Sequence, residues 1–233
     1  MFEGRDIEGD AKAILDTLAE GGVAVFPVTV GYAVVGHGAD AVARIYAAKE
    51  RSFAKPCGWF GDWTLFNDII DVDRRAREVV ASITQKHNLP FSIVAPFRAD
   101  HAFVNAVPDF VLESASLQGT MDMLLNAGAL HDAVARGARE RGMPVVGSSA
   151  NRSLTGSKYR LEDVEAQVRD AADLCVDYGL STYHNDKGLG STIVDLVSYK
   201  TFRIGCVYDD ICRILLDEFD IDLKAIGTDK IPA

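Results

Sequence analysis

The sequence is poor in the residues that build metal centres and disulfide frameworks. Its 233 residues include four cysteines and five histidines, and no two cysteines are spaced as CxxC. This spacing argues against a zinc site, and so few cysteines argue against a disulfide framework in a chain of this size. We therefore expect reduced thiols, a cytoplasmic location and no metal site built from side chains.

The sequence also lacks a basic excess and a long apolar run. It carries 34 acidic and 24 basic residues, for a net charge of -10. Proteins that bind nucleic acid broadly usually carry a basic excess, so broad RNA binding is not expected and a small anionic ligand is favoured. No apolar segment approaches the length of a membrane span, and the N-terminus does not resemble a signal peptide. A membrane partner is not expected either.

Amphipathic helical segments alternate with short apolar strands along the chain. Asp10 is expected to cap the first helix, and Asp40 to cap the second. We predict further helices over residues 72–86, 127–141, 161–169 and 207–219, and strands at residues 23–26, 32–35, 91–94, 144–146, 174–177, 192–195 and 202–204. This alternation predicts an α/β architecture. We expect one domain over residues 1–206, followed by a helix and polar tail over 207–233.

A cluster of cations follows the second predicted helix, in the pattern Lys49-x-Arg51-x-x-x-Lys55-Pro56. Pro56 prevents the helix from continuing, so the three side chains could converge where the chain turns. Convergent lysine and arginine side chains are typical of phosphate and carboxylate sites. The alternative, which the spacing leaves equally open, is a solvated helix end whose cations complement the helix dipole.

Two later segments place polar side chains beside predicted strands. Ser148-Ser149-Ala150-Asn151 follows one strand, and ligands of open α/β sheets bind at strand ends, although a turn or helix cap explains these residues as well. Ser191 stands at the mouth of another strand, and Arg203 lies within an apolar strand. Burial of Arg203 would be unfavourable without a partner, so it faces either solvent or an anion.

In this order, the segments resemble the YrdC/Sua5 family, which includes YciO. The matching motifs are Gly21 to Pro27, Lys49 to Pro56, Ser149-Ala150-Asn151, Ser191 to Asp195 and Arg203-Ile204-Gly205. The resemblance covers about residues 10 to 206 and implies a YrdC-like twisted mixed sheet with flanking helices and a concave basic cleft. It also implies that ATP, bicarbonate and L-threonine are condensed into threonylcarbamoyl-adenylate, as in tRNA modification, with release of pyrophosphate.

The resemblance assigns roles to ten residues. Lys49, Arg51 and Lys55 would hold phosphates and the substrate carboxylate as the catalytic cations. Nucleotide contacts would come from Ser149, Asn151, Ser191 and Arg203, and contacts with the second substrate from Thr29, Tyr32 and Ser92. Mg²⁺ would accompany the ATP. The chemistry asks mainly for positioning and charge neutralisation at the α-phosphate.

The sequence departs from the family pattern in three places. Val28 and Val30 stand where the opening motif has threonine, so two hydroxyl groups are lost. The RxP segment before the SAN motif is missing, because residues 119–126 contain no arginine. Leu154 and Thr155 lengthen the loop after the motif.

These departures affect the second substrate more than the fold, so a substrate other than threonine is expected. An adenylate hydrolase and a non-catalytic RNA-binding module remain alternatives. The sequence leaves open whether the chain forms a homodimer.

Overall fold

A computed structural model describes residues 5–229 of the chain, and within this range one mixed sheet of nine strands forms the centre of the molecule. The strand order is β7-β1-β2-β6-β3-β5-β4-β8-β9. The strands are β1 (Ala24–Val28), β2 (Gly31–Gly36), β3 (Gly58–Phe60), β4 (Phe91–Pro96), β5 (Thr120–Leu125), β6 (Val146–Ser149), β7 (Leu174–Cys175), β8 (Ile193–Asp195) and β9 (Thr201–Arg203). The sheet contains antiparallel pairs such as β1–β2 and β4–β5 and parallel pairs such as β3–β5 and β4–β8.

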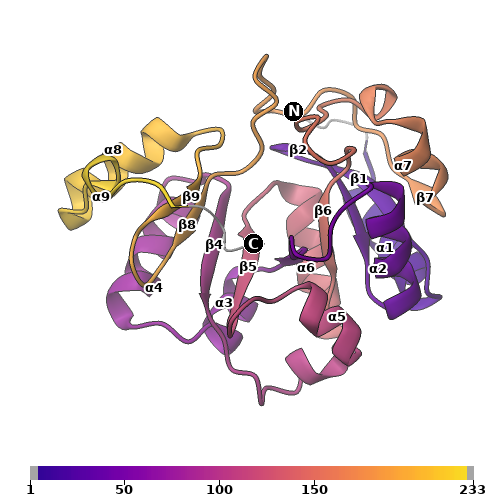
Figure 1. The fold of residues 1–233 in the computed structure, drawn as a ribbon, viewed down its shortest axis with the longest axis horizontal. Coiled ribbons are helices and arrows are strands. Elements are labelled where there is room, and N and C mark those ends of the chain that lie inside the picture. The colour runs from indigo at the N-terminus through magenta and orange to yellow at the C-terminus, as the bar shows by residue number, and fades with distance from the viewer. Residues whose placement is uncertain (1–4, 230–233) are drawn as a thin grey trace.

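Helices flank this sheet, as Figure 1 shows. They are α1 (Ile7–Ala19), α2 (Ala39–Ala48), α3 (Trp63–Ile69), α4 (Arg74–Ala81), α5 (Asp109–Ser114), α6 (Ala129–Glu140), α7 (Ala166–Asp170), α8 (Tyr208–Phe219) and α9 (Leu223–Ile226). A π-helical turn, Ser82–Lys86, continues α4. The expected α/β architecture with a twisted mixed sheet is confirmed.

The alternation of side chains along β1 explains why helices cover both of its faces. Phe26 and Val28 pack with the apolar side chains of α1 and α6, whereas Val25 packs with those of α2 and α7. A third and larger apolar cluster lies under β3, β4 and β5 and includes residues of α3, α4 and α8. Successive residues of a strand point to opposite faces, so a strand buried on both faces reads as a continuous apolar run.

Several predicted boundaries are corrected by the cap geometry. Asp6, and not Asp10, caps α1, because its side chain accepts a hydrogen bond from the Gly9 backbone N–H. Gly38, and not Asp40, precedes the first turn of α2. The helix expected at residues 161–169 divides into a 3-10 turn, Leu161–Asp163, and the short helix α7.

Other elements were not predicted from the sequence: β3, α3, α5, β5 and α9. No helix of the described range is long and apolar enough to span a membrane. The first four and last four residues, which include the ends of the polar N-terminus and C-terminal tail discussed above, lie outside the described range.

Candidate functional site

A single cleft of about 290 Å³ brings together the three polar segments singled out in the sequence. Its lining comes from the ends of β1 and β2, the faces of β3 to β6, the loop after α2, and β8 and β9. The polar lining includes Arg51, Ser92, Asp122, Ser148, Ser149, Ser191, Asp195 and Arg203. This volume lies near the lower end of the range for small-ligand sites, so the cleft suits a small molecule or part of one.

The two-residue period of the strands determines which side chains reach the cleft. On β5, Thr120, Asp122 and Leu124 line the cleft, while Met121, Met123 and Leu125 are buried in the core. Ser92 and Val94 reach the cleft from β4, and Ile193 and Asp195 from β8, with the same spacing. The sheet therefore presents one continuous face to a ligand.

Arg51 enters the cleft from the loop that follows α2. Its Nε donates to the carbonyl oxygen of Lys55 at 3.0 Å, and its Nη2 donates to that of Pro56 at 2.7 Å. These bonds fold the loop 51–56 back on itself and fix the position of the guanidinium. Within residues 5–229 the Arg51 Nη1 makes no hydrogen bond, and Nη2 can make a further one, so the group can still bind an anion.

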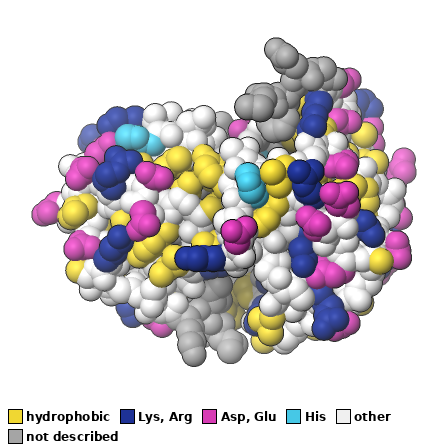
Figure 2. Space-filling model, turned by 90° about the horizontal axis from the view of Figure 1, so that it is seen from above, with side chains coloured by type: hydrophobic (Ala, Val, Ile, Leu, Met, Phe, Trp, Pro, Cys, Tyr) yellow, Lys and Arg dark blue, Asp and Glu magenta, His cyan; other side chains and the backbone are white. Residues whose placement is uncertain are grey.

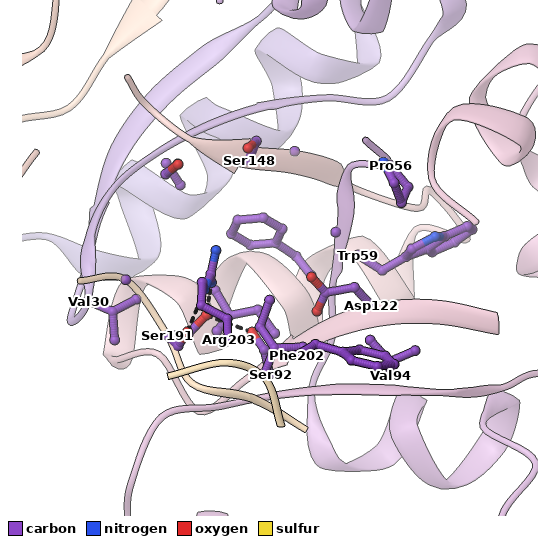
Figure 3. A pocket seen from close by; sticks show the side chains of 18 of the residues that line it. Val30, Pro56, Trp59, Ser92, Val94, Asp122, Ser148, Ser191, Phe202 and Arg203 are labelled. Atoms are coloured by element: carbon purple, nitrogen blue, oxygen red, sulfur yellow. Dashed lines mark hydrogen bonds between the residues drawn. The ribbon is translucent and has the colours of Figure 1, made fainter. Parts of the chain in front are cut away.

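Arg203 enters the cleft from β9 and is held by Ser191 (Figure 3). The Arg203 Nε donates to the Ser191 carbonyl oxygen at 2.8 Å, and Nη2 donates to Ser191 Oγ at 2.7 Å. Ser191 Oγ also lies 2.8 Å from Ser92 Oγ, and both serines are buried. The three residues form one network that fixes a guanidinium at the cleft.

Lys49 does not reach the cleft, although the sequence suggested that it would converge with Arg51. Only 1% of its surface is exposed, and its Nζ donates to the backbone carbonyl oxygens of Ser149 and Asn151. Burial, followed by the charge of Arg51, lowers the pKa of the Lys49 ammonium to about 7. Lys49 thus connects the end of α2 to the segment that follows β6.

The other predicted residues divide between the cleft and its surroundings. Ser149 borders the cleft, and so does Tyr32, whose hydroxyl donates to Asp177 Oδ1 at 2.6 Å. Lys55 is exposed and lies outside the cleft lining. Thr29, which is half-buried, and Asn151, which is buried, also lie outside the lining. The expected convergence of three cations therefore reduces to Arg51 alone, because two of them point elsewhere.

The cleft is less basic than the sequence suggested. Within residues 5–229, its charged lining consists of two arginines, Arg51 and Arg203, and two aspartates, Asp122 and Asp195. Asp195 Oδ1 is occupied, because it accepts hydrogen bonds from the backbone N–H groups of Val197 and Ser198. The valines that replace the expected threonines, Val28 and Val30, add apolar surface at one end of the cleft.

Asp122 is a charged lining residue that the sequence analysis missed. The segment 119–126 was noted only because it contains no arginine. Its alternation of Thr120, Asp122 and Leu124 with three apolar residues was a signal that the acid shares a face with a ligand cleft or with solvent. Burial raises the pKa of the Asp122 carboxyl to about 6, against the opposing effect of Arg203 and Arg51.

The residues present do not form a cage for the magnesium ion expected with ATP. Among the described residues, no group of three or more His, Cys, Asp or Glu side chains could hold a metal ion. Protein sites for Mg²⁺ often supply only one or two carboxylates and leave the rest of the shell to phosphates and water. The ion would therefore arrive as part of the nucleotide substrate.

One protein-family model matches most of the chain. The family model Sua5/YciO/YrdC, described as telomere recombination, matches residues 16–205. No curated protein matches the chain. The matched range contains every residue that has been placed in the cleft.

Solved structures match the fold at low identity. A hypothetical protein of Streptococcus mutans is 17% identical, with a TM-score of 0.75 over 90% of this chain and 92% of that one. Sua5 of P. abyssi in complex with L-threonine is 19% identical, with a TM-score of 0.70 over 89% of this chain and 58% of that one. HypF in a phosphate- and nucleotide-bound form is 15% identical, with a TM-score of 0.64 over 88% of this chain and 30% of that one. The chain thus spans just over half of Sua5.

Proposed function

Because the chain belongs to the Sua5/YciO/YrdC family, we propose that it is a nucleotidyltransferase that forms a carbamoyl-type adenylate from ATP. In this reaction bicarbonate and an amine condense to a carbamate, with loss of water. A carbamate oxygen then attacks the α-phosphorus of ATP, and the bond to the departing pyrophosphate breaks. The products are an acyl-type adenylate and pyrophosphate.

The observation that carries this proposal is the pair of fixed guanidiniums. Arg51 and Arg203 come from segments about 150 residues apart and line the same cleft, each held by hydrogen bonds to its surroundings. Charge on a transferring phosphoryl group is stabilised best by donors that are already in place before the reaction. The serine hydroxyls between the arginines supply further donors for phosphate or ribose oxygens.

Similar structures support a nucleotide and an amino acid as ligands. The Sua5 structure is a complex with L-threonine, and the HypF structure is a phosphate- and nucleotide-bound form. In our proposal Ser149, Ser191 and Arg203 face the nucleotide, Arg51 binds a phosphate or carboxylate, and Ser92 and Tyr32 border the second substrate. Lys49 supports the site from behind by holding the segment 149–151.

The test is pyrophosphate release from ATP and bicarbonate across a panel of amines. We expect Arg203→Met to lower the rate about 10²-fold, as the loss of a charged transition-state donor commonly does. Arg203→Lys should retain part of the rate, because lysine keeps the positive charge but cannot make the two parallel hydrogen bonds of a guanidinium. Arg213→Met, on the exposed side of α8, is the matched control and should leave the rate unchanged.

Two other outcomes would identify the alternatives. Release of AMP from a supplied threonylcarbamoyl-adenylate, without pyrophosphate formation from ATP, would indicate a hydrolase. Submicromolar RNA binding with steep salt dependence would indicate a binding module. Figure 2 shows a face on which lysine and arginine side chains lie among aspartate and glutamate side chains, which is unlike a continuous surface for a polyanion.

A further inference from the structure

Asp122 is a charged group in the cleft that the proposed phosphate chemistry does not use. It projects from the middle of β5 toward the cleft, between Trp59 and Arg203 in Figure 3. Its Oδ1 is buried and has no hydrogen-bond partner among residues 5–229, while the side chain as a whole is partly buried. A buried carboxylate oxygen with no partner is unfavourable, so a ligand that donates a hydrogen bond to Oδ1 would stabilise the carboxylate.

The cations nearest to Asp122 donate hydrogen bonds to acceptors other than its carboxylate. The charged and titratable groups that face it are Arg51 after α2, Arg203 on β9 and the Cys57 thiol before β3. Arg51 donates to two backbone carbonyls, and Arg203 donates to the carbonyl oxygen and hydroxyl of Ser191. Both guanidiniums lower the pKa of Asp122, yet burial outweighs them and the pKa stays near 6.

Apolar and aromatic side chains lie in the same cleft as Asp122, together with serine hydroxyls. Trp59, Phe60, Leu124 and Phe202 line the same cleft, and Val94 lies opposite Asp122 in the β4–β5 register. Aromatic faces attract organic cations, whereas they offer no ligand to a metal ion. Mg²⁺ requires a near-octahedral shell of oxygen atoms, and this part of the cleft supplies a single carboxylate.

We infer that Asp122 binds a cationic group of the second substrate, so that the amine used by this protein carries an additional ammonium or guanidinium. The second substrate is then a diamine or a basic amino acid and not a neutral amino acid such as threonine. The reacting nitrogen must be neutral to form a carbamate, and the second cationic group remains protonated against Asp122. That this compound is a substrate for adenylate formation rests on the proposed function, whereas the preference of the cleft for a cationic compound does not.

The experiment measures binding of paired compounds to the full chain by calorimetry. L-Lysine is compared with L-norleucine, and L-arginine with L-citrulline, because each pair differs in charge and little in shape. We expect the cationic member to bind at least about tenfold more tightly at neutral pH, the range of a charge-assisted contact in a partly buried site. The preference should fall as the pH drops below about 6, because the Asp122 carboxylate becomes protonated.

The variant Asp122→Asn keeps the shape of the side chain and should abolish the preference. Asp68→Asn, on the exposed side of α3, is the control and should retain it. Equal binding of charged and neutral compounds, no binding of any of the four, or a preference retained in Asp122→Asn would overturn the inference. Binding of magnesium chloride alone that is lost in Asp122→Asn would overturn it as well.

A parallel titration with ATP separates the inference from the proposed function. If ATP binds but the cationic preference is absent, the nucleotidyltransferase proposal survives and the role of Asp122 is refuted. If the cationic preference is present and ATP does not bind, the role of Asp122 stands and the nucleotide chemistry is refuted.

Discussion

Lys49 and Arg51 are two positions apart in the sequence and lie in different environments. Lys49 is buried and donates to two backbone carbonyls, whereas Arg51 lines the cleft. The sequence predicted a cluster of ligand-binding cations after α2, and one of them, Arg51, lines the cleft. It could not show which of the cations would be buried and bonded to the backbone. That depends on the carbonyl groups of residues 149 and 151, about 100 positions further along the chain.

Replacing Lys49 should therefore affect folding before it affects chemistry. Lys49→Met leaves the two carbonyl oxygens without their donor, and we expect the free energy of unfolding to fall by about 2 kcal/mol. Urea denaturation monitored by circular dichroism provides the measurement. Lys55→Met, in the exposed part of the same motif, should leave the midpoint unchanged. Equal midpoints for both variants would contradict the anchoring role.

Asp122 should make the stability of the chain depend on pH. The pKa of its carboxyl is about 6 when folded, against 3.8 ordinarily, so its contribution is fully present below pH 4 and is lost as the pH rises through 6. At about 1.4 kcal/mol for each pH unit, the difference is at most about 3 kcal/mol. Asp122→Asn should be more stable than the parent at neutral pH and similar near pH 4.

The measurement is a pair of urea titrations on each variant, one near pH 4 and one near neutral pH. Asp68→Asn serves as the control, because that exposed carboxylate should change neither titration. A parent protein whose stability rises between these pH values more than that of Asp122→Asn would contradict the assigned burial.

At the scale of elements, β6 lies between β2 and β3 in the sheet. The space around Gly147 on β6 is too small for a side chain. A Cβ atom there would lie 2.3 Å from the backbone oxygen of Val34 on β2, which cannot move without breaking the strand pair. We expect Gly147→Ala to lower the free energy of unfolding by about 2–3 kcal/mol. Gly38→Ala is the control, since a Cβ at Gly38 meets no atom within 4 Å. Thermal melts of the two variants should differ accordingly.

The longer helices were predicted from their clear helical period, whereas β5 was missed although its residues alternate. Ala11, Ile14, Leu15 and Leu18 recur with the helical period along α1, and all four are buried. The start of that helix was wrong because both Asp6 and Asp10 are suitable caps, and only the geometry shows that Asp6 bonds to Gly9. β3 was missed because three residues, Gly58–Phe60, are too few to show alternation.

At the scale of the molecule, the sheet order brings together segments that are far apart in the sequence. β6 pairs with β3, β3 with β5, β5 with β4 and β4 with β8, so the segments near positions 50, 120, 150 and 200 meet at one face. Local periodicity carries no information about this order. The family resemblance supplied it, and for that reason the convergence of Arg51, Ser149 and Arg203 was predicted while Asp122 was not.

The net charge predicts how the whole molecule behaves toward polyanions. With 34 acidic against 24 basic residues, we expect no submicromolar RNA binding at about 150 mM salt, where unspecific electrostatic attraction is weak. A filter-binding titration over a salt series tests this expectation. Tight binding whose logarithm falls steeply with the logarithm of salt would contradict it.

The alternation along β5 assigns core packing and cleft lining to different residues of the same strand. Met121, Met123 and Leu125 hold the strand in the core, and Thr120, Asp122 and Leu124 line the cleft. Substitutions at the second set of positions can change which molecule is accepted while the interior stays intact. Randomising positions 120, 122 and 124 together is therefore a direct route to altered selectivity in a chain that still folds.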